Sequence, residues 1–212
     1  MVIPALRFAP CGLRLLNPGY ACYPIAMEPK AILLNAEEFR RAAIMLEGDQ
    51  LRGDQMDPHV SVPLAVCNAF AAEMYLKFLV LIRTGKEARN THNLRKLFNL
   101  LPRSIQRLIQ REWENPPAIE QAIRAEISER FGSRTFDQTL DESADAFVEW
   151  RYHYEHKSLR RFSGDLMGAF RRVVFSLYPV EFADVRLPLP KGALSTTMQN
   201  VVRVAVKAPP KP

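Results

Sequence analysis

An arginine and a histidine with further cations after them form the one group of residues in this sequence whose spacing suggests chemistry. Arg151 and His156 are separated by four residues. Arginine makes bidentate contacts with phosphate, and histidine exchanges a proton near neutral pH. Together they could cleave RNA without a metal, His156 taking the 2′-hydroxyl proton while Arg151 holds the charge at phosphorus. Lys157, Arg160 and Arg161 follow and are candidate RNA-binding residues, because they would supply a local positive field.

Helical geometry sets a condition on this pair. Five residues along an ideal helix place the two side chains about 140° apart, so one straight helix presents them poorly. A helix that frays after Glu155 would bring them together, and so would two copies of the chain paired about a two-fold axis.

A structural role for the arginine is the competing interpretation. The helical spacing puts Arg151 on the core-facing side, where a cation needs a partner. Glu155 follows at the favourable spacing of four, and Glu73 is an acid inside an apolar helix. Lys77 is also four residues from Glu73, so the sequence leaves open which pair forms. Glu73, Arg151 and Glu155 are therefore the candidate members of a structural ion pair.

The elements that must position these residues are all predicted to be helices. Asn35 with Glu38 predicts a first helix, and the apolar run 62–84 predicts a central buried helix that ends at Gly85. Asn93 is the predicted cap of the next helix, and Ser104 the cap of the one that follows Pro102. The remaining predicted helices are 118–131, closed by Gly132, 141–155, which carries the arginine, and one that begins at Ser163 and ends before Pro179. The expected fold is all-α: a helical domain over residues 31–182, with flexible tails at 1–30 and 183–212.

Composition and charge limit the class of protein. The chain has 212 residues, 48% hydrophobic and 25% charged, which is typical of a globular protein. Its net charge is +6, but residues 1–30 carry three basic residues against one acidic, and residues 183–212 carry five against one. Residues 31–182 are therefore neutral overall. The sequence does not predict a general basic face, and any site for a polyanion must be local.

The cysteines and apolar segments indicate location. Cys11, Cys22 and Cys67 lack the spacing of metal ligands or of a disulfide framework, which favours a reducing compartment. Four prolines interrupt residues 1–26, so we expect no signal peptide there; this segment is either an extension or a consequence of an upstream start codon. Glu73 and Lys77 inside the run 62–84 argue against a membrane span. The expected location is cytoplasmic, with no membrane, metal or cofactor.

Several segments together resemble the HEPN family of small α-helical domains. They are EMYLK at residues 73–77, THNL at 91–94, WRY at 150–152 and YE at 154–155, and the likeness spans about residues 36–180. The resemblance implies a helical bundle that commonly forms a homodimer. In active members it implies a metal-independent endoribonuclease that uses an arginine, four to six residues and a histidine, a pattern that Arg151 and His156 match. It also suggests the ribonuclease of a defence or toxin-antitoxin system, with an antitoxin protein as partner.

The same resemblance leaves a second function open. Many relatives keep the arginine without the histidine, and Tyr152 stands where active members usually have a small polar residue or a histidine. The alternative is a noncatalytic dimerisation module or a module that binds nucleotide or RNA. Of the other histidines, His92 is expected to order a helix start, His153 to face away from Arg151, and His59 to lie in a loop without metal partners.

Overall fold

The structure is a computed structural model, and it describes residues 28–50, 58–152 and 162–188. Within these residues every regular element is a helix and none is a strand, which confirms the predicted all-α class. The elements in chain order are α1 (Pro29–Gln50), α2 (Pro58–Thr84), α3 (Leu94–Asn99), α4 (Arg103–Glu114), α5 (Ala118–Phe131), α6 (Phe136–Glu142), α7 (Ala146–Arg151), α8 (Gly164–Leu177) and the 3₁₀ helix η2 (Ala183–Val185).

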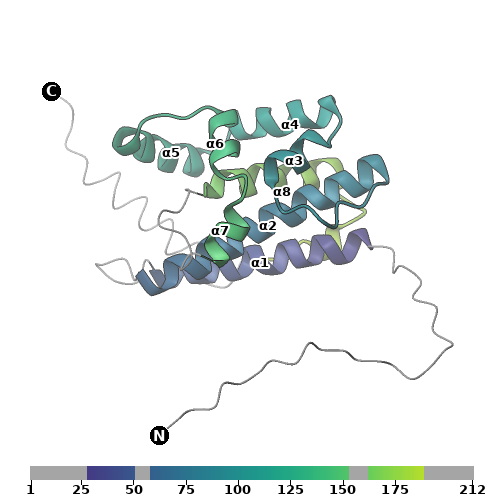
Figure 1. The fold of residues 1–212 in the computed structure, drawn as a ribbon, viewed down its shortest axis with the longest axis horizontal. Coiled ribbons are helices and arrows are strands. Elements are labelled where there is room, and N and C mark those ends of the chain that lie inside the picture. The colour runs from purple at the N-terminus through teal and green to yellow at the C-terminus, as the bar shows by residue number, and fades with distance from the viewer. Residues whose placement is uncertain (1–27, 51–57, 153–161, 189–212) are drawn as a thin grey trace, which may run out of the picture.

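The helix α2 is the centre of the fold. It runs antiparallel to α1, with α8 and α7 also packed against it, and α4 lies on the far side of α8 (Figure 1). Every residue from 71 to 80 is buried, including Tyr75 and Phe78. A helix that is apolar on all sides needs neighbours on all sides, and α1, α3, α7 and α8 supply them. This explains why the sequence of α2 lacks a polar face.

By length and composition alone, α2 would also be able to cross a membrane. Its apolar stretch covers Val60–Thr84, and 61% of the most apolar window is buried inside the fold. The core helix of a soluble protein has the same properties, so this feature by itself does not indicate a membrane span.

Proline and glycine set several helix ends. Pro29 is the first residue of α1, which therefore begins six residues before the predicted cap Asn35, because proline is well suited to the first helical position. The residue that precedes α4 is Pro102, so the predicted cap Ser104 lies inside that helix instead. Gly85 and Gly132 follow α2 and α5 with φ of 66° and 80°, as their predicted role as helix stops requires.

The prediction of one continuous helix over 141–155 is wrong for residues 141–151, where the end of α6, a turn and α7 take its place. Thr135 starts α6 with a capping box, in which its side chain accepts from Gln138 N and Gln138 accepts from Thr135 N. The chain then turns at residues 143–145 before α7 begins. In a continuous helix Ala144 O would accept from Val148 N, but here it accepts from Leu94 N at 2.8 Å. A tertiary hydrogen bond thus takes the place of a helical one.

A buried carboxylate joins α1, α2, α8 and the segment after η2. Glu37 is fully buried and accepts hydrogen bonds from Tyr75 Oη (2.5 Å), Arg171 Nε (2.6 Å), Arg40 (3.1 Å) and Leu187 N (3.1 Å). Arg40 also donates to Leu187 O at 3.0 Å. Residues 183–188, expected to begin the C-terminal tail, therefore pack against α1.

Candidate functional site

Arg151 ends α7 and is exposed, which corrects the prediction that it faces the core. The turn at residues 143–145 changes the helical phase, so Ala146 and Phe147 take the buried positions of α7. The guanidinium of Arg151 lies over the Phe147 ring, with Cζ 5.0 Å from the centroid, and over the Tyr152 ring at 4.5 Å. It also donates to Tyr152 Oη at 2.9 Å. The arginine therefore rests on aromatic surface with its charge near solvent.

Glu73 is fully buried on α2 and pairs with Lys77 rather than with Arg151. Lys77 Nζ lies 2.8 Å from Glu73 Oε1, at the i,i+4 spacing, and both side chains are buried. The predicted ion pair between Glu73 and Arg151 is therefore not formed, because the lysine one turn away meets the need of this carboxylate. Glu155, the other predicted partner of Arg151, lies outside the described residues.

His92 is the second partner of Glu73. Its Nδ1 lies 3.0 Å from the same Oε1, while 45% of the histidine side chain is exposed. The expected role of His92 at a helix start belongs instead to its neighbour, since Asn93 accepts from Lys96 N at 2.9 Å and caps α3. A half-exposed imidazole held by a buried carboxylate is the arrangement that orients a histidine for proton transfer.

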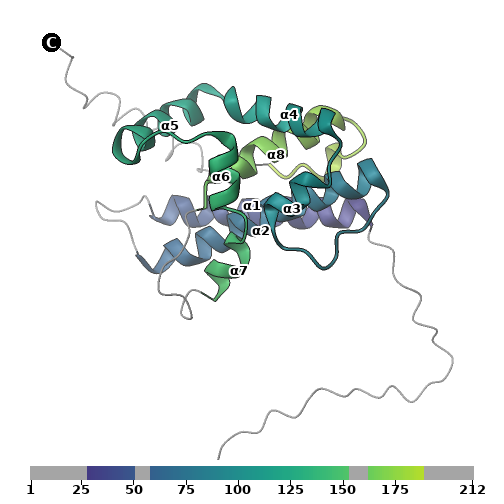
Figure 2. The ribbon, with the colours of Figure 1, turned by 45° about the horizontal axis from the view of Figure 1, so that its top comes forward.

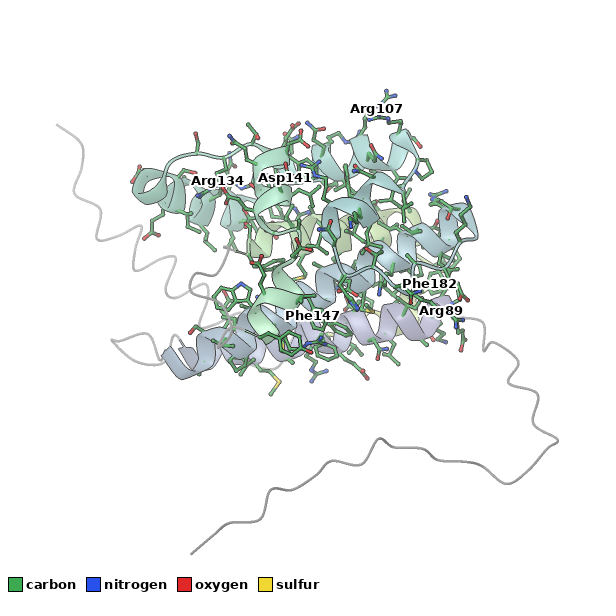
Figure 3. The ribbon with its side chains drawn as sticks, in the orientation of Figure 1. Arg89, Arg107, Arg134, Asp141, Phe147 and Phe182 are labelled. Atoms are coloured by element: carbon green, nitrogen blue, oxygen red, sulfur yellow. The ribbon has the colours of Figure 1, made fainter. Side chains whose placement is uncertain are left out.

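Phe147 connects the histidine and the arginine. The His92 ring lies 5.7 Å from the Phe147 ring, centroid to centroid, so the imidazole and the guanidinium of Arg151 contact one phenyl group. Phe70 packs against the same ring at 4.9 Å. In Figure 3 Phe147 lies by α1 and α2, on the opposite side of the molecule from Arg107 and Arg134. The candidate site is thus the surface around Phe147.

Two hydrogen bonds fix the loop of His92 to the start of α7. Asn93 Nδ2 donates to Asp145 Oδ1 at 2.8 Å, and Leu94 N donates to Ala144 O at 2.8 Å. Figure 2 shows α7 below α6, where it packs against α2. Because α7 is only six residues long, these bonds also set the position of its last residue, Arg151.

The remaining predicted site residues lie outside the described residues. They are the candidate base His156 and the candidate RNA-binding residues Lys157, Arg160 and Arg161. The structure places Arg151 and His92 at the same Phe147 ring, and it leaves the pairing of Arg151 with His156 a prediction.

Two hollows elsewhere have a different character. One, of about 210 Å³, lies between α3 and α4 and is lined by Arg103 and Arg107 among others; the Arg95 guanidinium beside them is held by Asp137 and Asp141. The other, of about 60 Å³, lies where α5 meets the beginning of α8, and Arg124 in its wall is paired with Asp165. Among residues 28–50, 58–152 and 162–188 no group of histidine, cysteine and acidic side chains is arranged to hold a metal ion.

The chain was compared with protein-family models, with curated proteins and with solved structures, and no match was found in any of the three.

The role of His92 was missed from sequence for an identifiable reason. Nineteen residues separate it from Glu73, and nothing in the local pattern around His92 points to a partner on another helix. The one available signal was Glu73 itself, because an acid inside an apolar helix requires a compensating donor. That requirement predicts a partner without naming it, and the structure supplies two.

Proposed function

We propose that this chain is a HEPN-like domain that cleaves RNA without a metal ion. In this proposal Arg151 binds the scissile phosphate, His156 takes the 2′-hydroxyl proton, and Lys157, Arg160 and Arg161 bind the RNA nearby. The products are a 2′,3′-cyclic phosphate and a 5′-hydroxyl. The activity fits a cytoplasmic homodimer that serves as the ribonuclease of a defence or toxin-antitoxin system, with an antitoxin as its protein partner.

The observation that carries the proposal is the state of Arg151. A guanidinium locked against buried carboxylates would have no capacity left for a phosphate, but Glu73 is occupied by Lys77 and His92. Arg151 is exposed and rests on Phe147 and Tyr152. An arginine held over aromatic rings keeps donor groups for bidentate contact with phosphate.

The second candidate function is RNA or nucleotide binding without cleavage. It is favoured by one contact, the hydrogen bond of 2.9 Å from Arg151 to the hydroxyl of Tyr152. This bond occupies one donor of the guanidinium, and the aromatic rings beneath it would stack on a base as well as on the arginine.

Labelled RNA in EDTA separates the two functions. The wild-type protein is compared with Arg151→Ala, His156→Ala and, as a matched control, Arg107→Ala, which removes an exposed arginine from α4. Cleavage predicts fragments with cyclic phosphate ends from the wild type and from Arg107→Ala, and a loss of roughly 10² to 10⁴-fold in His156→Ala. Intact RNA at every ratio of protein to RNA, with binding that depends on Arg151, would establish the noncatalytic function instead.

A further inference from the structure

Cleavage of RNA at the 2′-hydroxyl requires two proton transfers, and the proposed function assigns only one of them. The base removes the proton of the attacking hydroxyl, but the 5′ oxygen also leaves with a negative charge that a proton must neutralise. We infer that His92 is the general acid that protonates this 5′ oxygen. The inference rests on the proposed function, and it assigns a catalytic role to a residue that the short sequence motif does not include.

The contact with Glu73 determines which nitrogen of His92 is available. Glu73 forms an ion pair with Lys77, and an ionised carboxylate can only accept hydrogen bonds. The Nδ1 atom of His92, at 3.0 Å from Glu73 Oε1, must therefore carry its proton in both states of the ring. Nε2 is left as the atom that gains and loses a proton, and the 45% exposure of the side chain leaves the ring accessible to a substrate.

The position of His92 relative to the proposed phosphate clamp is fixed by the fold. The imidazole and the Arg151 guanidinium contact the same ring of Phe147, and the hydrogen bonds of Asn93 and Leu94 tie the histidine's loop to the start of α7. His92 and Arg151 therefore lie on one patch of surface, around the Phe147 ring. Proton transfer needs this kind of positioned donor.

The charges that face His92 come from α2 and from α7. Glu73 and Lys77 lie beneath it on α2 and balance each other. Arg151 shares the Phe147 ring from α7, and Asp145 at the start of α7 binds Asn93, the residue after the histidine. A bound phosphate would offset the charge of Arg151.

The 2′ oxygen bonds to phosphorus as its proton passes to the base of the proposed function. The bond between phosphorus and the 5′ oxygen breaks, its electron pair stays on that oxygen, and the proton on His92 Nε2 passes to it. Neutral His92 then takes a proton from solvent while the base returns its proton to solvent, so no metal, oxidant or other reactant is required.

The test uses an RNA oligonucleotide with one 5′ oxygen replaced by sulfur at the cleaved linkage. A thiol has a pKa of about 8.5, so a thiolate leaves without a proton from an acid. The full-length wild type and His92→Asn are compared on the sulfur-containing RNA and on the ordinary RNA in EDTA. Asparagine keeps a donor for Glu73 but cannot transfer a proton, and thermal unfolding checks that the variant is folded.

If His92 is the acid, His92→Asn loses roughly 10² to 10⁴-fold on the ordinary RNA and retains a rate within about tenfold of wild type on the sulfur-containing RNA. Equal losses on both RNAs would show a structural role and overturn the inference, and so would no loss on either. Each of these results leaves the proposed function standing. A wild-type protein that cleaves neither RNA would overturn the proposed function and the role of His92 with it.

Discussion

Glu73, buried in the middle of α2, holds the half-exposed ring of His92 through a contact of 3.0 Å between Oε1 and Nδ1. The same oxygen lies 2.8 Å from Lys77 Nζ. One carboxylate thus serves two purposes, since it neutralises a lysine that would otherwise be buried alone and it orients a histidine at the surface.

The pair of Glu73 and Lys77 yields a first prediction about stability. Glu73→Leu leaves Lys77 buried without its partner and should lower the free energy of unfolding by about 3–5 kcal/mol. The double variant Glu73→Leu/Lys77→Met replaces both charges by apolar groups and should recover most of this loss. Urea unfolding of the three proteins measures the difference, and a double variant as unstable as the single one would contradict the explanation.

Arg151→Ala should leave stability nearly unchanged. The side chain is exposed and stacks on aromatic rings, so its loss should cost less than about 1 kcal/mol. Thermal unfolding beside Arg107→Ala provides the comparison. A loss above about 2 kcal/mol in Arg151→Ala alone would mean that the arginine is part of the scaffold.

Glu37 predicts the acid sensitivity of the fold. Burial raises the pKa of this carboxyl, but hydrogen bonds from Arg171 and Tyr75, with the charges of Arg171 and Arg40, outweigh burial and lower the pKa below its ordinary value. Because the pKa of Glu37 is lower in the folded protein, its ionised carboxylate stabilises the fold fully at pH values above the pKa that a glutamate has in the unfolded chain, about 4.3. This stabilisation is lost as the pH falls through the pKa of Glu37 in the folded protein.

Urea unfolding between pH 7 and pH 3 measures this effect. The free energy of unfolding should fall as the pH drops below about 4. Tyr75→Phe removes one donor to Glu37 and should cost about 1.5–3 kcal/mol at pH 7, because a hydrogen bond to a charged group is lost. Equal stability of Tyr75→Phe and wild type at pH 7 would refute the role assigned to this hydrogen bond.

Asn93 is predicted to support both α3 and the position of His92. Asn93→Ala removes the cap of α3 and the bond to Asp145, and should destabilise the protein by about 1–2 kcal/mol. Asn99→Ala, at the exposed end of the same helix, is the matched control and should change stability by less than about 0.5 kcal/mol. Amide hydrogen exchange should also quicken at Leu94, whose N–H bonds to Ala144. Unchanged exchange at Leu94 would show that the loop is held by other contacts.

Local signals in the sequence predicted much of the fold. The apolar run of α2, the cap Asn93, and the stop residues Gly85 and Gly132 each act within a few residues, so their effects can be recognised without tertiary information. The helix 118–131 was placed correctly at both ends for the same reason. The packing of residues 183–188 on α1 was not predicted, because it depends on Glu37, about 150 residues earlier in the chain.

The candidate site was only partly predictable, because its geometry depends on one break in a helix. The expectation that Arg151 faces the core assumed a continuous helix over 141–155, and the turn at 143–145 changed the face on which the arginine lies. That turn is stabilised by Asn93 and Leu94, which approach from another part of the chain. Because the same turn leaves Arg151 exposed, Glu73 pairs with Lys77 and not with Arg151.

The role of Arg151 as the phosphate-binding residue is decided by the cleavage rate of Arg151→Ala relative to that of Arg107→Ala, on one RNA in EDTA. We predict that both variants are nearly as stable as wild type and that Arg107→Ala cleaves at a rate within about threefold of wild type. Arg151→Ala should be slower by about 10²-fold or more, as expected when a preorganised donor to the transition state is removed. Equal rates in the two variants would refute this role, because they would show that the exposed guanidinium beside Phe147 does not bind the reacting phosphate.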